Sequence, residues 1–268
     1  MSALAHDGHW VPNVGYWPLA VVSVPATGSP DQEPAPRTAT GVLSDDPAPD
    51  LSILERLGPA RAEVNRFLLE YRSGIEAVRT KITILQQEFL TLHDHNPIEH
   101  VGSRLKTPES IIAKAARKDL PLSLPAIRAG ITDIAGVRVT CSFVSDVHGL
   151  AETLTQQPDL TVVRVKDYIA TPKANGYRSL HLQVTVPVFL STSVVHVPVE
   201  IQLRTTAMDF WASLEHKIHY KYDAAVPADV RQHLREAAET AHHLDSLMEH
   251  LHRRVHTPPD DVSPTSSA

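Results

Sequence analysis

Two stretches of the chain place apolar residues at alternating steps of three and four, which is the spacing of a long helix with a heptad stripe. The first runs from about Ala60 to Leu92, and Asn96-Pro97 ends it. Its stripe is Val64, Leu68, Tyr71, Ile75, Val78, Ile82, Leu85, Phe89 and Leu92. The second stripe is Leu234, Ala237, Ala241, Leu244, Met248, Leu251 and Val255. Long N- and C-terminal helices are expected, packed on each other, on a sheet between them, or at a subunit interface.

Strand and helix patterns alternate between these two helices. The strands are predicted at 134–143, 160–166, 177–186 and 194–203, and the helices at 145–156 and 206–222. Only a short connection separates the last two strands, which predicts a hairpin. The pattern therefore indicates an α+β or α/β domain built around one mixed sheet.

The predicted strands gather polar side chains on one face, because successive side chains of a strand point to opposite sides. In the last strand this face holds His196, Glu200, Gln202 and Arg204. In the strand before it the set is Tyr177, Ser179, His181 and Gln183, and in the first strand it is Gly136 and Arg138. A solvated face of an antiparallel sheet would show the same alternation. The mixture of acid, amide, imidazole, phenol and guanidinium groups points to a functional site.

A basic segment precedes the first predicted strand. Thr107-Pro108-Glu109 is a strong helix start, with Thr107 as the N-cap. One face of that helix would carry Ser110, Lys114 and Arg117, with Arg104 and Lys106 just upstream. The opposite face would carry Ile111, Ile112, Ala115 and Ala116. This basic face is either simply solvated or a polyphosphate site, since cations there would neutralise charge during phosphoryl transfer.

Two carboxylates could hold a magnesium ion. Asp133 lies just before the first strand and Glu200 lies on the last one. Oxygen ligands from carboxylates, together with substrate phosphates, are what Mg²⁺ prefers. We expect the two acids to approach each other across one cleft with a cationic rim. The sequence contains neither a P-loop nor a GxGxxG motif, so nucleotide binding would need another architecture.

Composition narrows the class of protein. The 268 residues are 42% hydrophobic and 21% charged, with a net charge of −6, which argues against a basic nucleic-acid-binding surface and against DNA as a partner. The one cysteine, Cys141, excludes an internal disulfide framework. No apolar run has the length of a membrane span and no leader is evident, so a soluble cytoplasmic protein without a membrane partner is expected. Residues 1–50 and 257–268, rich in proline and polar residues, are expected to be mostly disordered around a folded domain at 51–256.

Several runs resemble, in their order, the alarmone synthetase domain of the RelA/SpoT family. They are His100-Val101-Gly102-Ser103-Arg104-Leu105-Lys106-Thr107-Pro108-Glu109-Ser110, Asp133-Ile134-Ala135-Gly136-Val137-Arg138, Asp167-Tyr168-Ile169, Pro172-Lys173-Ala174-Asn175-Gly176-Tyr177-Arg178-Ser179-Leu180-His181, Glu200-Ile201-Gln202-Leu203-Arg204-Thr205 and Phe210-Trp211-Ala212-Ser213-Leu214-Glu215-His216. Together they span about Asn96 to Tyr222, and the chain looks like a stand-alone small alarmone synthetase.

The resemblance implies a nucleotidyltransferase-like mixed sheet and transfer of pyrophosphate from ATP to the ribose 3′-hydroxyl of GDP or GTP. It also implies Mg²⁺ as cofactor, and members of this kind are often homotetramers. By this analogy Asp133 would hold Mg²⁺, while Glu200 would activate the 3′-hydroxyl and also contact the metal. Tyr177 would stack on guanine, and Asp209 would help to read the base. The guanine nucleotide would also be contacted by Lys173, His181 and Gln202. ATP would be bound by Arg104, Lys106, Ser110, Lys114, Arg117 and Arg138.

Three other functions compete with this interpretation. The chain could be a relative without turnover that senses nucleotides or binds RNA, although both candidate carboxylates and Tyr177 are present. It could be another Mg²⁺-dependent nucleotidyltransferase with a similar sheet. Long family members also carry a hydrolase domain with a metal-binding His-Asp pair, and His6-Asp7 and His93-Asp94 occur here. We expect no hydrolase activity, because the helical hydrolase domain has no room in the chain.

Overall fold

A computed structural model describes residues 11–12, 51–221 and 226–256 of the chain. The chain divides into two compact units, residues 14–65 and the remainder, and the first is described only over 51–65. The prediction of disorder for 1–50 and 257–268 therefore concerns residues that lie outside the described ones, apart from Val11–Pro12. None of the described helices has the length and apolar character needed to cross a membrane.

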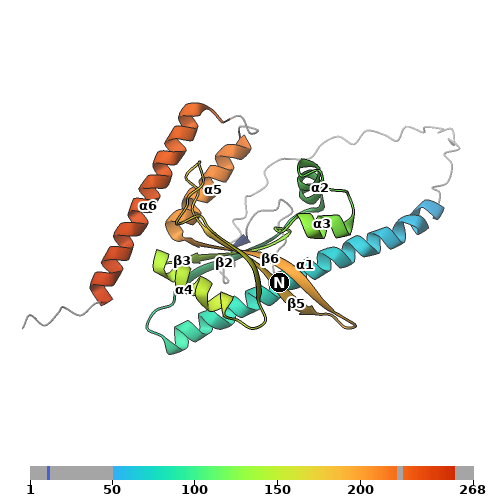
Figure 1. Cartoon of the computed structure of the whole chain (residues 1–268), viewed down its shortest axis with the longest axis horizontal. Coiled ribbons are helices and arrows are strands. Elements are labelled where there is room, and N and C mark those ends of the chain that lie inside the picture. The colour runs from blue at the N-terminus through green and yellow to red at the C-terminus, as the bar shows by residue number, and fades with distance from the viewer. Residues whose placement is uncertain (1–10, 13–50, 222–225, 257–268) are drawn as a thin grey trace, which may run out of the picture. The chain divides into compact units, whose positions relative to one another are not determined.

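A six-stranded mixed sheet forms the centre of the fold, with the strand order β1-β2-β3-β6-β5-β4 (Figure 1). The strands are β1 (Val11–Pro12), β2 (Ile98–Leu105), β3 (Ala135–Cys141), β4 (Thr161–Asp167), β5 (Leu180–Phe189) and β6 (Val194–Thr205). β3 and β6 pair in parallel, and the other neighbours are antiparallel. The mixed sheet and the β5–β6 hairpin are thus confirmed.

In the part of the chain that the structure describes, six helices accompany the sheet. They are α1 (Leu51–Leu92), α2 (Pro108–Arg117), α3 (Leu124–Gly130), α4 (Val144–Thr155), α5 (Thr206–Lys221) and α6 (Ala228–His256). The helices expected from periodicity are all present, and α1 begins earlier than expected. Sequence patterning missed β2 and α3. β2 has only one fully buried residue, so it lacks a clear apolar alternation, and α3 has 7 residues, too few for helical periodicity to show.

The core lies against the apolar face of the sheet. From Arg66 onward, α1 buries five members of its predicted stripe: Tyr71, Ile75, Val78, Ile82 and Leu85. A Cβ added to Gly74 would lie 2.8 Å from Cγ1 of Val197, so the helix backbone comes very close to β6. α4 also contacts β3, β5 and β6 and buries Leu150 and Leu154. Each such aliphatic side chain contributes about 1.5–3 kcal/mol to folding when it is removed from water.

Leu234 is the one member of the apolar stripe predicted for α6 that is buried in the described structure, so the expectation that the stripe packs within the chain is wrong for most of the rest of it. Of the described side chains, Leu234, Ala238, Asp245 and Glu249 are buried. Asp245 accepts a hydrogen bond from Thr205 Oγ1 at 2.8 Å, and Glu249 accepts two from Ser145. The exposed members of the α6 apolar face are Leu244, Leu247, Met248, Leu251 and Val255, at 45–79% exposure. Polar anchors, which periodicity does not count, orient this helix.

Candidate functional site

Strand register brings the predicted polar residues together on one face of the sheet. Glu200 on β6 lies opposite Gly136 on β3 and Gln183 on β5. Gln202 lies opposite Arg138 and His181 in the same way. The valines and leucines of alternate positions face the core. The alternation of side chains along the sequence therefore gave the correct face for each of these residues.

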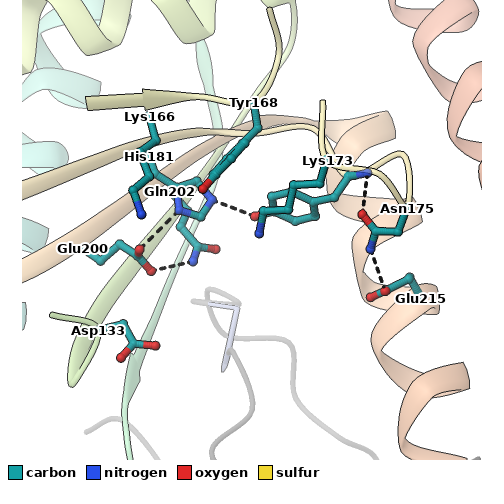
Figure 2. Close-up of a pocket in the computed structure, with 10 residues that line it drawn as sticks. Asp133, Lys166, Tyr168, Lys173, Asn175, His181, Glu200, Gln202 and Glu215 are labelled. Atoms are coloured by element: carbon teal, nitrogen blue, oxygen red, sulfur yellow. Dashed lines mark hydrogen bonds and ion pairs between the residues drawn. The ribbon is translucent and has the colours of Figure 1, made fainter. Parts of the chain in front are cut away.

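A cavity of about 430 Å³ opens over this face (Figure 2). Six of the predicted site residues line it: Asp133, Lys173, Tyr177, His181, Glu200 and Gln202. Asp133 and Glu200 thus share one cavity, as expected from the sequence. Four further lining residues were given no role by the sequence analysis: Lys166, Tyr168, Asn175 and Glu215. Tyr168, Asn175 and Glu215 belong to the motif runs that resemble the family, and this membership could have indicated them as site residues. Lys166 lies outside the runs.

Asp133 is held by two lysines from the predicted basic segment. Its Oδ2 lies 2.7 Å from Nζ of Lys114 on α2 and 3.1 Å from Nζ of Lys106. Burial raises the pKa of Asp133, but the hydrogen bonds and charges of Lys114 and Lys106 outweigh it and leave the pKa below its usual value. Burial lowers the pKa of Lys106, and the charge of Asp133 partly opposes that shift. The carboxylate is therefore ionised at neutral pH.

The oxygen atoms around Asp133 fit a magnesium ion. Among the residues that the structure describes, the buried Oδ1 of Asp133 has no hydrogen-bond partner. Glu200 supplies further carboxylate oxygens to the same cavity. The described part of the chain contains no group of three or more His, Cys, Asp or Glu side chains placed to hold a metal. Mg²⁺ commonly keeps water and substrate phosphate oxygens among its ligands, so two protein carboxylates are a sufficient donor set.

Both oxygens of Glu200 accept hydrogen bonds from within the sheet. Oε1 lies 3.2 Å from His181 Nδ1, and Oε2 lies 2.8 Å from Gln202 Nε2. Burial raises the pKa of Glu200, but the interaction with His181 and the hydrogen bond from Gln202 outweigh it, so the pKa lies below its usual value. The charge of Asp133 acts in the opposite direction and raises it. Glu200 is thus an ionised, oriented carboxylate facing the cavity.

Tyr177 forms one wall of the cavity, at the end of the loop that leads into β5. Two cations lie near the ring, with Lys173 Nζ 4.4 Å and Arg204 Cζ 5.1 Å from its centroid. Asn175 Oδ1 accepts a hydrogen bond from the Tyr177 amide, and Asn175 Nδ2 donates to Glu215 on α5. These bonds fix the loop, so the aromatic ring is held ready to stack on a flat ligand.

Asp209 lies outside the lining of the cavity and contacts two arginines instead. Its Oδ1 is 3.0 Å from Arg138 Nη1 and 3.0 Å from Arg204 Nη1. Burial, together with the positive charge of Arg204, lowers the pKa of Arg138 to about 10. Arg138 remains protonated at neutral pH. Asp209 and Arg138, predicted to touch different nucleotides, are joined to each other beneath the cavity.

The remaining predicted ATP residues lie on β2 and α2. Arg104 lies opposite Gly136 in the β2–β3 ladder. Thr107 caps α2 as predicted, accepting a hydrogen bond from the Ser110 amide, and Ser110 and Arg117 are exposed. The apolar face of α2 is narrower than expected. Ile111 and Ala115 are buried, whereas Ile112 and Ala116 are exposed, because α2 touches the core along only one line of its surface.

The second His-Asp pair lies away from this cavity. His93 and Asp94 line a different cavity of about 450 Å³, between the end of α1 and α4. In it His95 Nε2 lies 3.0 Å from Asp146 Oδ2. The other pair, His6-Asp7, lies outside the described residues.

Comparison with known proteins agrees with this geometry. Residues 103–225 match the model of the region found in RelA and SpoT proteins. The GTP pyrophosphokinase YwaC of Bacillus subtilis is 48% identical over 208 residues, which cover 77% of this chain and 99% of that protein.

Two solved structures of small alarmone synthetase 1 from Bacillus subtilis share the fold. The one bound to its product pppGpp has a TM-score of 0.68 and 41% identity, covering 73% of this chain and 99% of that chain. The one bound to AMPCPP has a TM-score of 0.64 and 36% identity, covering 74% of this chain and 100% of that chain. With its sheet, its shared-carboxylate cavity and these relatives, the chain belongs to the RelA/SpoT family, among its small alarmone synthetases.

Proposed function

We propose that this chain transfers the pyrophosphate group of ATP to the ribose 3′-hydroxyl of GDP or GTP, producing ppGpp or pppGpp and AMP. The observation that carries the proposal is the common cavity of Asp133, Glu200 and Tyr177 in a member of this family. The names of the relatives support it, since they are GTP pyrophosphokinases and a synthetase bound to pppGpp.

The acceptor nucleotide occupies the side of the cavity that Tyr177 forms. Its guanine stacks on the Tyr177 ring, and Lys173, His181 and Gln202 contact the nucleotide. Its 3′-hydroxyl lies at Glu200, whose carboxylate is ionised and already oriented by His181 and Gln202. Glu200 accepts the proton of the hydroxyl as the oxygen attacks, the role of a general base.

The donor nucleotide occupies the basic side, around β2 and α2. Arg104 and Arg138 flank the adenine, while Lys106, Ser110, Lys114 and Arg117 bind the phosphates of ATP. The 3′-oxygen forms a bond to the β-phosphorus, the bond from that phosphorus to the α–β bridging oxygen breaks, and AMP leaves with the electron pair. The lysines offset the negative charge that develops on the transferred group and on AMP.

Asp133 and Glu200 are the residues that would hold Mg²⁺. The orphaned Oδ1 of Asp133 and the carboxylate of Glu200 support this assignment. When bound, the ion would neutralise phosphate charge and help to align the reacting groups. In its absence Lys106 and Lys114 hold the carboxylate of Asp133 in place.

The exposed apolar face of α6 supports assembly of this chain with copies of itself. An apolar face of this kind on a surface helix usually lies at an interface. We therefore extend the proposal to a homo-oligomer, a homotetramer by analogy with small synthetases. The single cysteine and the nucleotide substrates support a cytoplasmic location for the protein.

One assay separates this function from its competitors. The protein is incubated with Mg²⁺, ATP labelled in its β-phosphate, and GDP or GTP, and the products are resolved by chromatography. We expect AMP and a guanosine nucleotide carrying label on its 3′-pyrophosphate. No turnover would favour the nucleotide-sensing or RNA-binding relative, and a nucleotidylated product would favour another nucleotidyltransferase. Breakdown of added pppGpp in the presence of metal would instead reveal hydrolase activity.

A further inference from the structure

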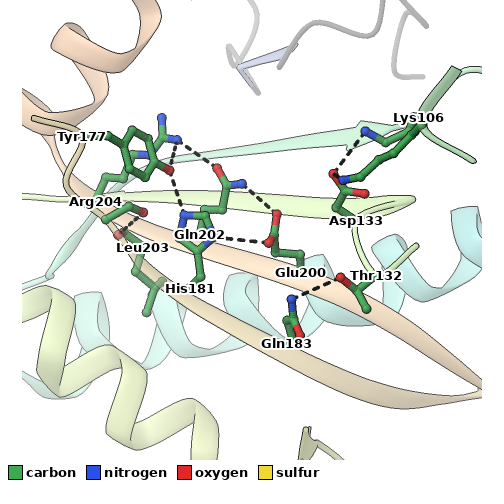
Figure 3. A network of polar contacts seen from close by, with 12 residues as sticks. Lys106, Thr132, Asp133, Tyr177, His181, Gln183, Glu200, Gln202, Leu203 and Arg204 are labelled. Atoms are coloured by element: carbon green, nitrogen blue, oxygen red, sulfur yellow. Dashed lines mark hydrogen bonds and ion pairs between the residues drawn. The ribbon is translucent and has the colours of Figure 1, made fainter. Parts of the chain in front are cut away.

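A buried arginine links the two residues that hold Glu200, contacting Gln202 directly and His181 through Tyr177. Arg204, near the end of β6, is 4% exposed. Its Nη2 lies 2.7 Å from the hydroxyl of Tyr177 and 3.0 Å from Oε1 of Gln202 (Figure 3). Its Nη1 donates to Asp209. Tyr177 continues to His181 at 2.8 Å, and His181 and Gln202 both end on Glu200. The five side chains form a closed ring that starts and ends at Arg204.

A guanidinium group can only donate hydrogen bonds, and this fixes the direction of the ring on the Gln202 side. Because Arg204 donates to Gln202, the atom facing it must be the amide oxygen. The amide nitrogen of Gln202 must then face Glu200, to which it donates at 2.8 Å. A glutamine amide that flipped would place its oxygen against the carboxylate, where two acceptors repel. Arg204 therefore decides which end of Gln202 meets the proposed base.

The same constraint acts on the Tyr177 side. The hydroxyl oxygen accepts from Arg204, and the Glu200 carboxylate can only accept, so His181 donates from Nδ1. In the neutral imidazole Nε2 then accepts the hydroxyl hydrogen of Tyr177. An Nε2 that accepts leaves the imidazole hydrogen on Nδ1, which is the atom 3.2 Å from Oε1 of Glu200. Both arms thus deliver one N–H to each oxygen of Glu200. The remaining lone pairs of the carboxylate are free to face the cavity.

We propose that Arg204 is a positioning residue for the transfer reaction: it sets the hydrogen-bond direction of the Gln202 arm, holds the Tyr177 hydroxyl that meets His181, and so orients Glu200 toward the acceptor hydroxyl. The inference rests on the proposed function, in which Glu200 is the base. Asp209 contributes to this positioning, because it accepts a hydrogen bond from Arg204 Nη1 and so holds the guanidinium group in its orientation. Arg204 itself does not line the cavity, so it acts through Tyr177 and Gln202.

The test is steady-state kinetics of the full-length chain with ATP and GDP. Arg204→Gln cannot donate to Tyr177, Gln202 and Asp209 at once, so we expect kcat to fall by about 10- to 100-fold, the usual cost of losing a residue that orients a catalytic ligand. The KM for ATP should change by no more than about twofold, because Arg204 affects the proposed ATP residues indirectly, through its charge and the Asp209 carboxylate that it shares with Arg138. Arg204→Lys, which keeps the charge and part of the donors, should recover part of kcat.

Arg178→Gln is the matched control. Arg178 is another shielded arginine, two residues before β5, but it donates to the Ile169 carbonyl and to Glu239, away from Glu200. The Arg178→Gln variant should lower the thermal midpoint of unfolding as much as Arg204→Gln does, while its kcat stays close to the wild-type value. If both variants reduce kcat equally, Arg204 has only a structural role and the inference is wrong.

A double-mutant cycle adds a readout that stability alone would not move. If Arg204 acts through the Tyr177 hydroxyl, Tyr177→Phe should lower kcat less in the Arg204→Gln background than in the wild type, by a factor of about three or more. Additive losses would overturn the inference. Should Arg204→Gln fail to fold, Arg204→Lys takes its place in the cycle. Wild-type protein that makes no product would refute the proposed function instead, so the two failures are distinguishable.

Discussion

Lys114 reaches from α2 to Asp133, the residue two positions before β3, and places its Nζ 2.7 Å from the Oδ2 atom. Lys106 approaches the same oxygen from the end of β2. A basic helix face that could have been merely solvated therefore points into the site. The contact also explains how the carboxylate stays ionised in a half-buried position before any nucleotide binds.

We expect Asp133→Asn to abolish synthesis while the fold is retained. The amide keeps the shape of the side chain but removes the charge that Lys106, Lys114 and a metal need, at a cost of about 100-fold or more in kcat. Rates are measured with increasing Mg²⁺, and circular dichroism checks the fold. Asp119→Asn, on the exposed end of the α2–α3 turn, is the control and should behave as wild type. A wild-type rate for Asp133→Asn would remove its assigned role.

Glu200→Gln should also stop synthesis but leave acceptor binding in place. The amide cannot accept the proton of the 3′-hydroxyl, so kcat should fall by about 10²- to 10⁴-fold. GDP binding, measured by calorimetry without ATP, should stay within about threefold, because Tyr177 and Lys173 are untouched. A variant that turns over at the wild-type rate would show that another group takes the proton.

Gly176→Ala should weaken acceptor binding through the loop that carries Tyr177. Gly176 has φ +92°, and an added Cβ would lie 2.5 Å from the Cβ of Ala238 on α6. The strain and the overlap together cost about 1–3 kcal/mol, which moves the loop or α6. KM for GDP should rise more than KM for ATP.

The rescue experiment for this loop combines two changes. Ala238→Gly removes the overlap with a methyl group at position 176 but leaves the positive φ, so the double variant should recover part of the acceptor KM. Full additivity of the two single variants would show that the contact between the loop and α6 does not matter.

Docking of α6 should depend on pH through Asp245. Burial raises the pKa of Asp245 to about 6, against the hydrogen bond from Thr205 and the charge of Arg178, which lower it. Because the pKa of Asp245 is higher in the folded chain than the value of 3.8 in the unfolded chain, the neutral carboxyl group favours the folded state. This stabilisation is fully present below pH 3.8 and is lost as the pH rises through about 6. Across this pH range the contribution of Asp245 to the free energy of unfolding changes by about 3 kcal/mol.

Asp245→Asn supplies the comparison, since its amide oxygen still accepts from Thr205. Between pH 4 and pH 7, the thermal midpoint of the wild type should fall relative to that of Asp245→Asn. Parallel curves for the two proteins would mean that another group controls the docking of α6.

The exposed apolar face of α6 should control assembly. Leu244→Asp with Leu251→Asp places two charges on this face, and we expect the protein to shift to a smaller assembly in light scattering. Substituting Glu236 and Glu239, exposed on the same helix, with glutamine should leave the mass unchanged. An unchanged mass in the aspartate variant would place the interface elsewhere.

Local patterning was sufficient for much of the fold. The steps of three and four in α1 identified the side chains that cover the sheet, and strand alternation placed Glu200, Gln202 and His181 on one face. These rules succeed because helix and strand geometry repeats along the backbone, whatever lies around it. They failed at β2 and α3, which are too polar or too short to show a period, and at α6, whose buried face combines Asp245 and Glu249 with Leu234 and Ala238.

Long-range proximity was decided by the tertiary structure alone. The ordered motif runs already indicated the family and named Asp133 and Glu200, yet 67 positions separate the two acids, and strand pairing brings them to one cavity. The sequence placed Arg204 on the correct face, but nothing in it says that its donors reach both Tyr177 and Gln202. Hydrogen-bond direction depends on which groups meet in space, and side-chain contacts across a sheet follow from register and packing, which no local period encodes.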